Sequence, residues 1–360
     1  AVRTEMSAVA NSVCSLAGKF RGCLVGSLLG DCLGAPFEGD FPISKSVLTS
    51  YVSKLLDESA KGLLPFRPYT DDTAMTRCLA TSLIEKKGFH ASDLAQRFTS
   101  EYFEQPKRGY GPNVVDVFHA LKKGNFEDPF GPAKSQFEGT GSYGNGGAMR
   151  VAPVALFCHK NMAEMISVAE KQAHITHTHK NGYNGAVLQC LAVHRAVTSD
   201  AQVPLNKAAF LDFLLEQMDT IESKGTKLVT DPTVDKPFTT SLQNMRRVLC
   251  DEPRDLSAEE VAALFGNDVS AHKSVPTAIY AFLRSHEPLP FFQTENPFVR
   301  AIVLSISVGG DTDTIASMAG SISGAFHSLS GIPTSLQRHC EGLDITLKLA
   351  DDMYDFVGSH

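Results

Sequence analysis

The chain has 360 residues, of which 43% are hydrophobic and 20% charged, and its formal net charge is −7 at pH 7. This composition is ordinary for a globular protein, and the negative charge argues against non-specific binding to nucleic acid or to an anionic membrane surface. No uninterrupted apolar run reaches the roughly 18 residues that a membrane-spanning helix needs.

The first predicted element is a glycine-rich helix. Residues 1–17 are rich in Ala and Ser and are expected to form a disordered tail, with a transit peptide as the alternative. Four glycines then follow at steps of four, from Gly22 to Gly34, beside leucines at the same spacing. Each glycine costs a helix about 1 kcal/mol, so we expect this helix to lie very close to a neighbouring backbone. Arg21 and Asp31 favour a buried helix of a soluble core over a membrane segment.

Helical periodicity dominates the rest of the chain, whereas alternating strand patterns are nearly absent. Ser92 is the expected N-cap of one helix, and Gly124 is the expected end of another. Residues 223–240 and 286–297 are expected to be loops. Length alone suggests about two domains, but no linker divides the chain, so we predict one all-α domain over residues 18–360. The expected helices are 73–87, 94–103, 114–123, 148–157, 163–173, 185–198, 207–221, 242–249, 258–265, 276–283, 298–307, 314–327 and 343–356.

Two short acidic segments each stand at the start of a predicted helix. One reads Tyr-Thr-Asp-Asp-Thr over residues 69–73, and the other reads Gly-Gly-Asp-Thr-Asp-Thr over residues 309–314. N-capping is one explanation, since Asp and Thr stabilise helix starts. Several adjacent carboxylates repel one another, however, and a hard divalent cation such as Mg²⁺, Ca²⁺ or Mn²⁺ would reverse that repulsion. We therefore predict that the two segments converge on a pair of metal ions.

Three further features point to a ligand site. Glu38 follows Pro36 on a predicted loop, where it is either a solvated surface residue or within reach of a substrate. The segment Gly139–Arg150 contains five glycines, which let backbone N–H groups approach a phosphate, although a flexible surface loop is the alternative. Tyr143 and Phe137 are candidates for stacking on an adenine ring. His174, His177 and His179 lack the partners of a usual zinc site, and either a hydrogen-bonding role at the site or a partly buried helix end is favoured.

Together these segments resemble the ADP-ribosyl-glycohydrolase family. The matching pieces are G-D-C-L-G, Y-T-D-D-T-A-M, G-S-Y-G-N-G-G-A-M-R-V, G-Y-N-G-A and G-G-D-T-D-T-I-A. The resemblance implies a compact, orthogonal, all-α fold with a binuclear magnesium site in which Mn²⁺ substitutes for Mg²⁺. It implies a catalytic role for Glu38 and metal ligands at Thr70, Asp71, Asp72, Asp311, Asp313 and Thr314. It also implies ADP-ribose contacts from Gly109, Gly111, Phe137, Ser142, Tyr143, Gly144, Asn145, Gly147, His177 and Val269.

Within that family the chain is similar to the branch that hydrolyses ADP-ribosyl-serine and poly(ADP-ribose), because it carries a Glu on the loop after the first Gly-Asp helix. The expected substrates are ADP-ribosylated proteins, poly(ADP-ribose) and O-acetyl-ADP-ribose. The alternatives are an ADP-ribosyl-arginine hydrolase and a catalytically inactive ADP-ribose-binding protein. None of the eight cysteines forms a C-x-x-C motif, so we expect reduced thiols. Reduced thiols fit residence in the nucleus and cytoplasm, with the mitochondrial matrix as a further compartment. We also expect a monomer.

Overall fold

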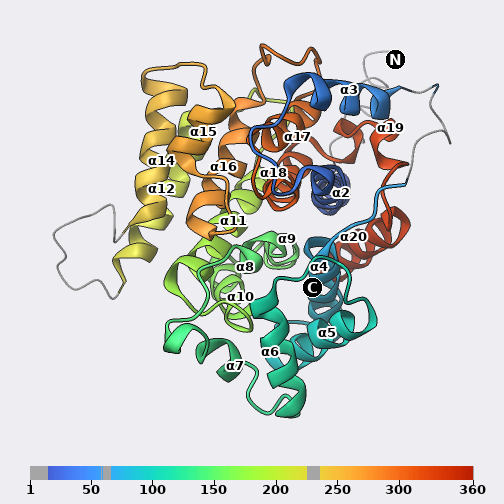
Figure 1. Ribbon diagram of the computed structural model, residues 1–360, viewed down its shortest axis with the longest axis vertical. Coiled ribbons are helices and arrows are strands. Elements are labelled where there is room, and N and C mark those ends of the chain that lie inside the picture. The colour runs from blue at the N-terminus through green and yellow to red at the C-terminus, as the bar shows by residue number, and fades with distance from the viewer. Residues whose placement is uncertain (1–14, 58, 60–65, 225–235, 360) are drawn as a thin grey trace.

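The centre of the molecule is built from two helices in backbone contact, α2 (Leu16–Gly34) and α18 (Thr312–His327) (Figure 1). The computed structural model describes residues 15–57, 59, 66–224 and 236–359. A Cβ atom added to Gly26 would lie 2.1 Å from the carbonyl oxygen of Gly320. One added to Gly30 would lie 2.0 Å from that of Ala316. The glycine row therefore exists because no side chain fits between the two helices, as predicted.

The remaining helices surround this pair (Figure 1). Within the described residues there are no β-strands but only isolated bridges, which confirms the all-α prediction. The helices are α3 (Lys45–Leu56), α4 (Asp71–Lys86), α5 (Ala91–Glu104), α6 (Pro112–Lys123), α7 (Gly131–Lys134), α8 (Gly146–Met149), α9 (Ala152–Phe157), α10 (Met162–His174), α11 (Lys180–Thr198), α12 (Lys207–Ser223), α14 (Pro237–Arg246), α15 (Ala258–Phe265), α16 (Ala271–Arg284), α17 (Pro297–Ser307), α19 (Thr334–Gln337) and α20 (Leu343–Gly358). Short 3-10 helices stand at η1 (Ala35–Phe37), η3 (Phe137–Gly139) and η5 (Leu329–Gly331), and α14 continues into the π-helix η4 (Arg247–Asp251).

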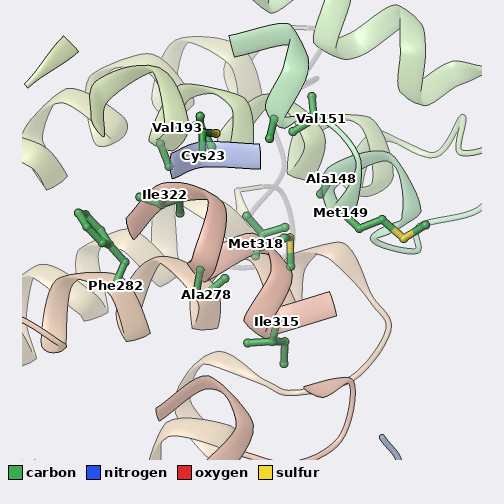
Figure 2. Packing of buried hydrophobic residues seen from close by; sticks show 14 of the residues in the cluster. Cys23, Ala148, Met149, Val151, Val193, Ala278, Phe282, Ile315, Met318 and Ile322 are labelled. Carbon is green, nitrogen blue, oxygen red and sulfur yellow. The ribbon is translucent and has the colours of Figure 1, made fainter. Parts of the chain in front are cut away.

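One continuous hydrophobic core joins these helices, so the chain folds as one domain rather than two. Figure 2 shows part of this core, where Met318 and Ile322 of α18 lie among side chains from its neighbours. Those neighbours include Val193 on α11 and Phe282 on α16, both fully buried. Because α18 is covered on all sides, the acidic residues at its start are held in a rigid frame.

Several helix boundaries differ from the predictions. The N-cap of α5 is His90, whose ring accepts a hydrogen bond from the backbone N–H of Asp93, so Ser92 lies inside the first turn. Helix α16 begins five residues before Pro276 and contains it. The predicted helix 148–157 is divided into α8 and α9, because Pro153 in the first turn of α9 has no N–H to continue a helix.

Two regions predicted as non-helical are partly helical. Helix α3 was not expected, although Leu48, Val52 and Leu55 recur at a helical spacing and are buried. Within the predicted loop 223–240, α14 begins at Pro237, whereas residues 225–235 lie outside the described residues. The predicted loop 286–297 is confirmed up to Pro297, where α17 begins.

Of the predicted tail, residues 1–14 lie outside the described residues, and α2 already begins at Leu16 with Ser15 as its N-cap. No helix in the described part of the chain is both long enough and apolar enough to cross a membrane. Every described cysteine is free.

Candidate active site

The two acidic segments meet at the starts of α4 and α18. Thr70 is the N-cap of α4, which begins at Asp71, and Asp311 is the N-cap of α18. The hydroxyl of Thr314 lies 3.3 Å from Oδ1 of Asp72 and joins the two segments directly. Residues that are 311 − 72 = 239 positions apart in the sequence therefore converge, as predicted.

Asp31 on α2 fixes the start of α4, a role that the sequence analysis missed. Its carboxylate accepts hydrogen bonds from the backbone N–H of Thr70 at 3.0 Å and of Thr73 at 3.1 Å. It also accepts one from the hydroxyl of Thr73 at 2.6 Å. Asp31 thus caps α4 from a different helix. A buried acid in a glycine-rich apolar helix was the available signal, but the spacing did not reveal its partner.

Burial makes the charged forms of the clustered carboxyl groups unfavourable when no cation is bound. Desolvation and then the charge of Asp31 raise the pKa of Asp71 to about 8. Desolvation and then the charge of Asp311 raise the pKa of Asp313 to about 10. The pKa of Asp72 is raised for the same reason, with Asp313 as its main like-charged neighbour. A cluster of this kind needs a cation to be fully ionised near neutral pH.

The donor set of the cluster fits a divalent cation. Carboxylate oxygens of Glu38, Asp311 and Asp313 all lie within 4.8 Å of one another. Oδ2 of Asp72 is buried and has no hydrogen-bond partner. A buried carboxylate oxygen without a donor is unfavourable, and a hard cation would supply the missing partner. Asp311 and Asp313, two of the six predicted metal ligands, are members of this group of three neighbouring carboxylates.

Glu38 stands at the rim of this cluster on the loop after η1, as predicted. The loop is tied to the segment before α18, since the N–H of Gly39 donates to the carbonyl of Gly310 at 2.8 Å. The N–H of Gly310 donates back to the carbonyl of Asp40 at 3.0 Å. Gly310 has a φ of 73°, a conformation that favours glycine. Partial desolvation, then the charges of Asp311 and Asp31, raise the pKa of Glu38.

A cavity of about 290 Å³ extends from the acidic cluster to the glycine-rich segment. Many of the predicted site residues line it, namely Glu38, Asp71, Asp72, Gly109, Gly111, Ser142, Gly144, Asn145, His177, Val269, Asp311, Asp313 and Thr314. The sequence analysis did not single out the other lining residues, which are Met75, Pro112, Asn113, Val114, Gln136, Gly146, Met149, Arg150 and Thr176. The cavity therefore has a carboxylate end and a glycine-rich end.

The glycine-rich segment is shaped around His177. A Cβ atom on Gly146 would lie 2.4 Å from Cε1 of the His177 ring, so this position has no room for a side chain. Nδ1 of His177 lies 2.7 Å from the hydroxyl of Thr176. Burial, and then the charge of Arg150, lower the pKa of His177 to about 3. His177 is therefore a neutral hydrogen-bonding group at this end, in agreement with the role favoured from the sequence.

The predicted adenine-contacting residues lie at the surface. The exposed fraction of the side chain is 52% for Tyr143 and 46% for Phe137. Neither lines the cavity, but each is adjacent in sequence to a residue that does. The Tyr143 ring packs edge-on against His179, with ring centroids 5.9 Å apart. Val269 is 62% exposed and is held beside the glycine-rich segment because its carbonyl accepts the N–H of Asn145 at 2.9 Å.

Three of the predicted site residues have prominent contacts within the protein itself. The side-chain amide of Asn145 donates to Oδ2 of Asp311 at 2.6 Å, so it orients a carboxylate of the cluster. A Cβ atom on Gly147 would lie 2.7 Å from that of Ala173, which makes Gly147 a packing position. Thr70 accepts the N–H of Asp72 at 3.3 Å as a helix cap. Their assignment to metal or substrate stays a prediction.

Comparison with known proteins agrees with this geometry. A family model described as ADP-ribosylglycohydrolase matches residues 14–359. The ADP-ribosylhydrolase ARH3 of Mus musculus is 42% identical over 343 residues, covering 93% of this chain and 91% of its own. The Homo sapiens protein of that name is 40% identical, with 93% of each chain covered. The Danio rerio protein is also 40% identical and covers 97% of this chain and 94% of its own.

A solved structure, an ADP-ribosylglycohydrolase-related protein complex, shares the fold with a TM-score of 0.62 and 20% identity. It covers 95% of this chain, and 99% of its own length is aligned. The family match over nearly the whole chain, the identity to the three relatives and the converging acidic segments lead to one conclusion. The chain belongs to the ADP-ribosylglycohydrolase family.

Proposed function

We propose that this protein hydrolyses the glycosidic bond between ADP-ribose and serine on modified proteins, and that it also degrades poly(ADP-ribose) and O-acetyl-ADP-ribose. The observation that carries the proposal is the buried convergence of Asp71 and Asp72 with Asp311 and Asp313, beside Glu38 and at one end of a cavity. Relatives named ADP-ribosylhydrolase ARH3, identical to this chain at 40–42% of positions, support the reaction class.

The cofactor in this proposal is a pair of Mg²⁺ ions, with Mn²⁺ as a substitute. The buried, unpartnered Oδ2 of Asp72 and the oxygen group of Glu38, Asp311 and Asp313 support a hard cation. When bound, such ions supply positive charge that fixes and polarises oxygen atoms of the substrate. Asp71, Asp72, Asp311 and Asp313 would hold them, with Thr70 and Thr314 as hydroxyl ligands. Asn145 and Asp31 keep these groups in place.

In hydrolysis the bond from the anomeric carbon to the serine oxygen breaks, water supplies the new C–O bond, and the departing oxygen gains a proton. The transition state has oxocarbenium character, as in other glycosidic cleavages. Glu38 is the group placed to move a proton, because it stands at the rim of the carboxylate cluster and lines the cavity. It either protonates the leaving oxygen or takes a proton from water.

The deciding experiment is release of free ADP-ribose from a serine-ADP-ribosylated peptide, first with Mg²⁺ and then with EDTA. We expect release with Mg²⁺ and none with EDTA. A peptide of the same sequence carrying arginine-linked ADP-ribose is the matched substrate. Preferential release from that peptide would replace the serine proposal with an arginine linkage. Tight ADP-ribose binding without release from either peptide would make the protein an ADP-ribose reader.

Glu38→Gln tests the catalytic group separately. We expect it to abolish most of the ADP-ribose release while leaving ADP-ribose binding close to that of the unchanged protein. Glu127→Gln, at an exposed position away from the cavity, is the control. Full activity in Glu38→Gln, with normal binding, would remove Glu38 from the mechanism.

We further propose that the protein resides in the nucleus and cytoplasm, with the mitochondrial matrix as a further compartment. We also propose that it is a monomer. The free cysteines of the described residues agree with a reducing compartment. Fractionation of cells that express the protein would test the first point. Light scattering on the purified protein would test the second.

A further inference from the structure

Arg150 is a buried cation at the glycine-rich end of the cavity. Its side chain is fully buried, with 0% exposed, and it borders the cavity as the single lysine or arginine among the described lining residues. Every ionisable lining residue around it is either an acid or His177. Arg150 is therefore the protein's own source of positive charge in a cavity otherwise dominated by carboxylates.

Among the residues that the structure describes, Arg150 forms no salt bridge, and its hydrogen bonds go to neutral groups. Its Nε donates to Oε1 of Gln172 at 2.8 Å, and its Nη2 donates to the backbone carbonyl of Gln172 at 2.8 Å. Nη1 faces the thioether sulfur of Met75 at 3.8 Å, and the guanidinium lies 4.5 Å from the centre of the Phe98 ring. All of these partners are neutral, although burying an unpaired charge is strongly unfavourable. Burial lowers the pKa of Arg150 to about 9, and the charge of Asp71 at the carboxylate end offsets part of that effect.

Gln172 holds the guanidinium in a fixed position relative to the glycine-rich segment. The neutral amide of Gln172 also donates to the carbonyl of Gly147 at 2.7 Å, so Arg150 and the glycine-rich segment form one rigid unit. The positive charge of Arg150 reaches His177, where it helps keep the ring neutral. Because the guanidinium is shielded from water, salt does not screen its field as it would at the surface.

We propose that Arg150 is a specificity residue, which acts through its buried charge to select ligands that carry a diphosphate over uncharged nucleosides. This inference rests on the proposed function, because ADP-ribose carries two negative charges on its diphosphate. Arg150 needs no direct contact with the ligand for this effect. A buried charge acts over several ångströms in a medium of low dielectric constant.

The test is calorimetric titration of Mg²⁺-saturated protein with ADP-ribose, ADP and adenosine. In Arg150→Met we expect the Kd for ADP-ribose and ADP to rise roughly 10-fold or more, the scale of a lost charge interaction at partly screened distance. The Kd for adenosine is expected to stay within about 2-fold, since it carries no charge. Arg150→Lys keeps the charge and is expected to retain most of the preference for ADP-ribose over adenosine.

Two variants separate charge from structure. Arg300 is also buried, with 6% exposed, and donates only to the carbonyls of Ser285 and Thr294, but it does not line the cavity. Arg300→Met should lower stability and leave the ratio of the ADP-ribose and adenosine Kd values unchanged. Gln172→Met removes the amide link to Gly147 but keeps the charge of Arg150, and it should leave most of the ratio intact.

An unchanged ratio in folded Arg150→Met would overturn the proposal. So would a loss in Gln172→Met equal to that in Arg150→Met, because positioning rather than charge would then explain it. If Arg150→Met does not fold, Arg150→Gln keeps donors without charge and gives the same comparison. These measurements are independent of turnover, so failure of the hydrolase proposal would appear as absent ADP-ribose release with normal ligand ratios.

Discussion

The two ends of the cavity differ in how far the protein builds them before a ligand arrives. At the carboxylate end, Asp72 is 1% exposed and Asp313 is 5% exposed. At the glycine-rich end, Arg150 is fully buried, but Val269 on the rim is 62% exposed and Tyr143 beside it is 52% exposed. The carboxylate end is therefore built into the folded core, whereas the rim of the glycine-rich end lies at the surface.

The difference has a physical cause. The carboxylates stand at the starts of α4 and α18, and Asp31 and the glycine row of α2 hold those helices in place. Such a cluster is unfavourable without a cation, so the folding free energy maintains it in a geometry ready to bind one. Tyr143 and Val269 already contact water, and their substitution affects binding without a large effect on stability. Stability and ligand binding are therefore expected to be coupled at the carboxylate end and separable at the exposed rim of the glycine-rich end.

The largest effect is expected for Asp72→Asn. ADP-ribose release should fall by about 100-fold or more, because this residue is central to the predicted cation site and even supporting groups of such sites matter by 10- to 100-fold. Without metal, in EDTA, its Tm should rise, because Asp72 ionises readily only in the unfolded chain and Asn removes that advantage of unfolding. The release assay would check the first expectation and thermal unfolding in EDTA the second. Asp116→Asn, at an exposed position outside the cavity lining, is the control, and a lower Tm for Asp72→Asn in EDTA would contradict the account.

Gly30→Ala should be strongly destabilising, because it disturbs the contact between α2 and α18 that supports the carboxylate end. Alanine gains up to about 1 kcal/mol of helix propensity, but its Cβ would lie 2.0 Å from the carbonyl oxygen of Ala316. Overpacking against backbone outweighs that gain, and we expect a net loss of about 2 kcal/mol or more. Urea unfolding measures it. Gly358→Ala, where a Cβ meets no atom within 4 Å, should be neutral or slightly stabilising; equal losses in both would refute the packing argument.

Above about pH 7, the pH dependence of the metal-free protein should report the carboxylate end, because the lowered pKa of buried histidines such as His177 acts in the opposite direction only at lower pH. The pKa of Asp71 is raised from 3.8 to about 8, so the folded protein binds more protons than the unfolded chain between those values. The free energy of unfolding in EDTA should therefore fall as the pH rises from about 7 to about 8. Mg²⁺ should reverse most of the loss at the upper end, since it binds the ionised form. Stability that rises with pH in EDTA would contradict the cluster electrostatics.

Tyr143→Ala should have the smallest effect on stability, within about 0.5 kcal/mol, because the residue is a surface position. Its Kd for ADP-ribose should rise about 10-fold, the scale of one lost base–aromatic stack. Val203→Ala, another exposed position, is the control. A stability loss comparable with that of Gly30→Ala would remove the contrast between the two ends.

Local sequence patterns predicted much of the carboxylate end. The pairs Asp71–Asp72 and Asp311–Asp313 each stand at a helix start, so one convergence of two helices was enough to assemble the cluster. The glycine-rich end was less predictable, because Val269 reaches the cavity only through pairing of its segment with Asn145. Arg150 ends the glycine-rich segment, but its position in the sequence did not indicate that its guanidinium is buried beside the cavity.

By itself the sequence determined the helical class, the single domain, the glycine-lined contact and the two acidic helix starts, because helical spacing and local residue chemistry encode these features. The tertiary structure decided which distant groups became partners. Asp31 caps α4, Asn145 orients Asp311, and Arg150 is enclosed among neutral groups beside the cavity. These relations depend on how helices pack across long sequence separations, and side-chain burial and pKa follow from that packing rather than from the identity of the residue.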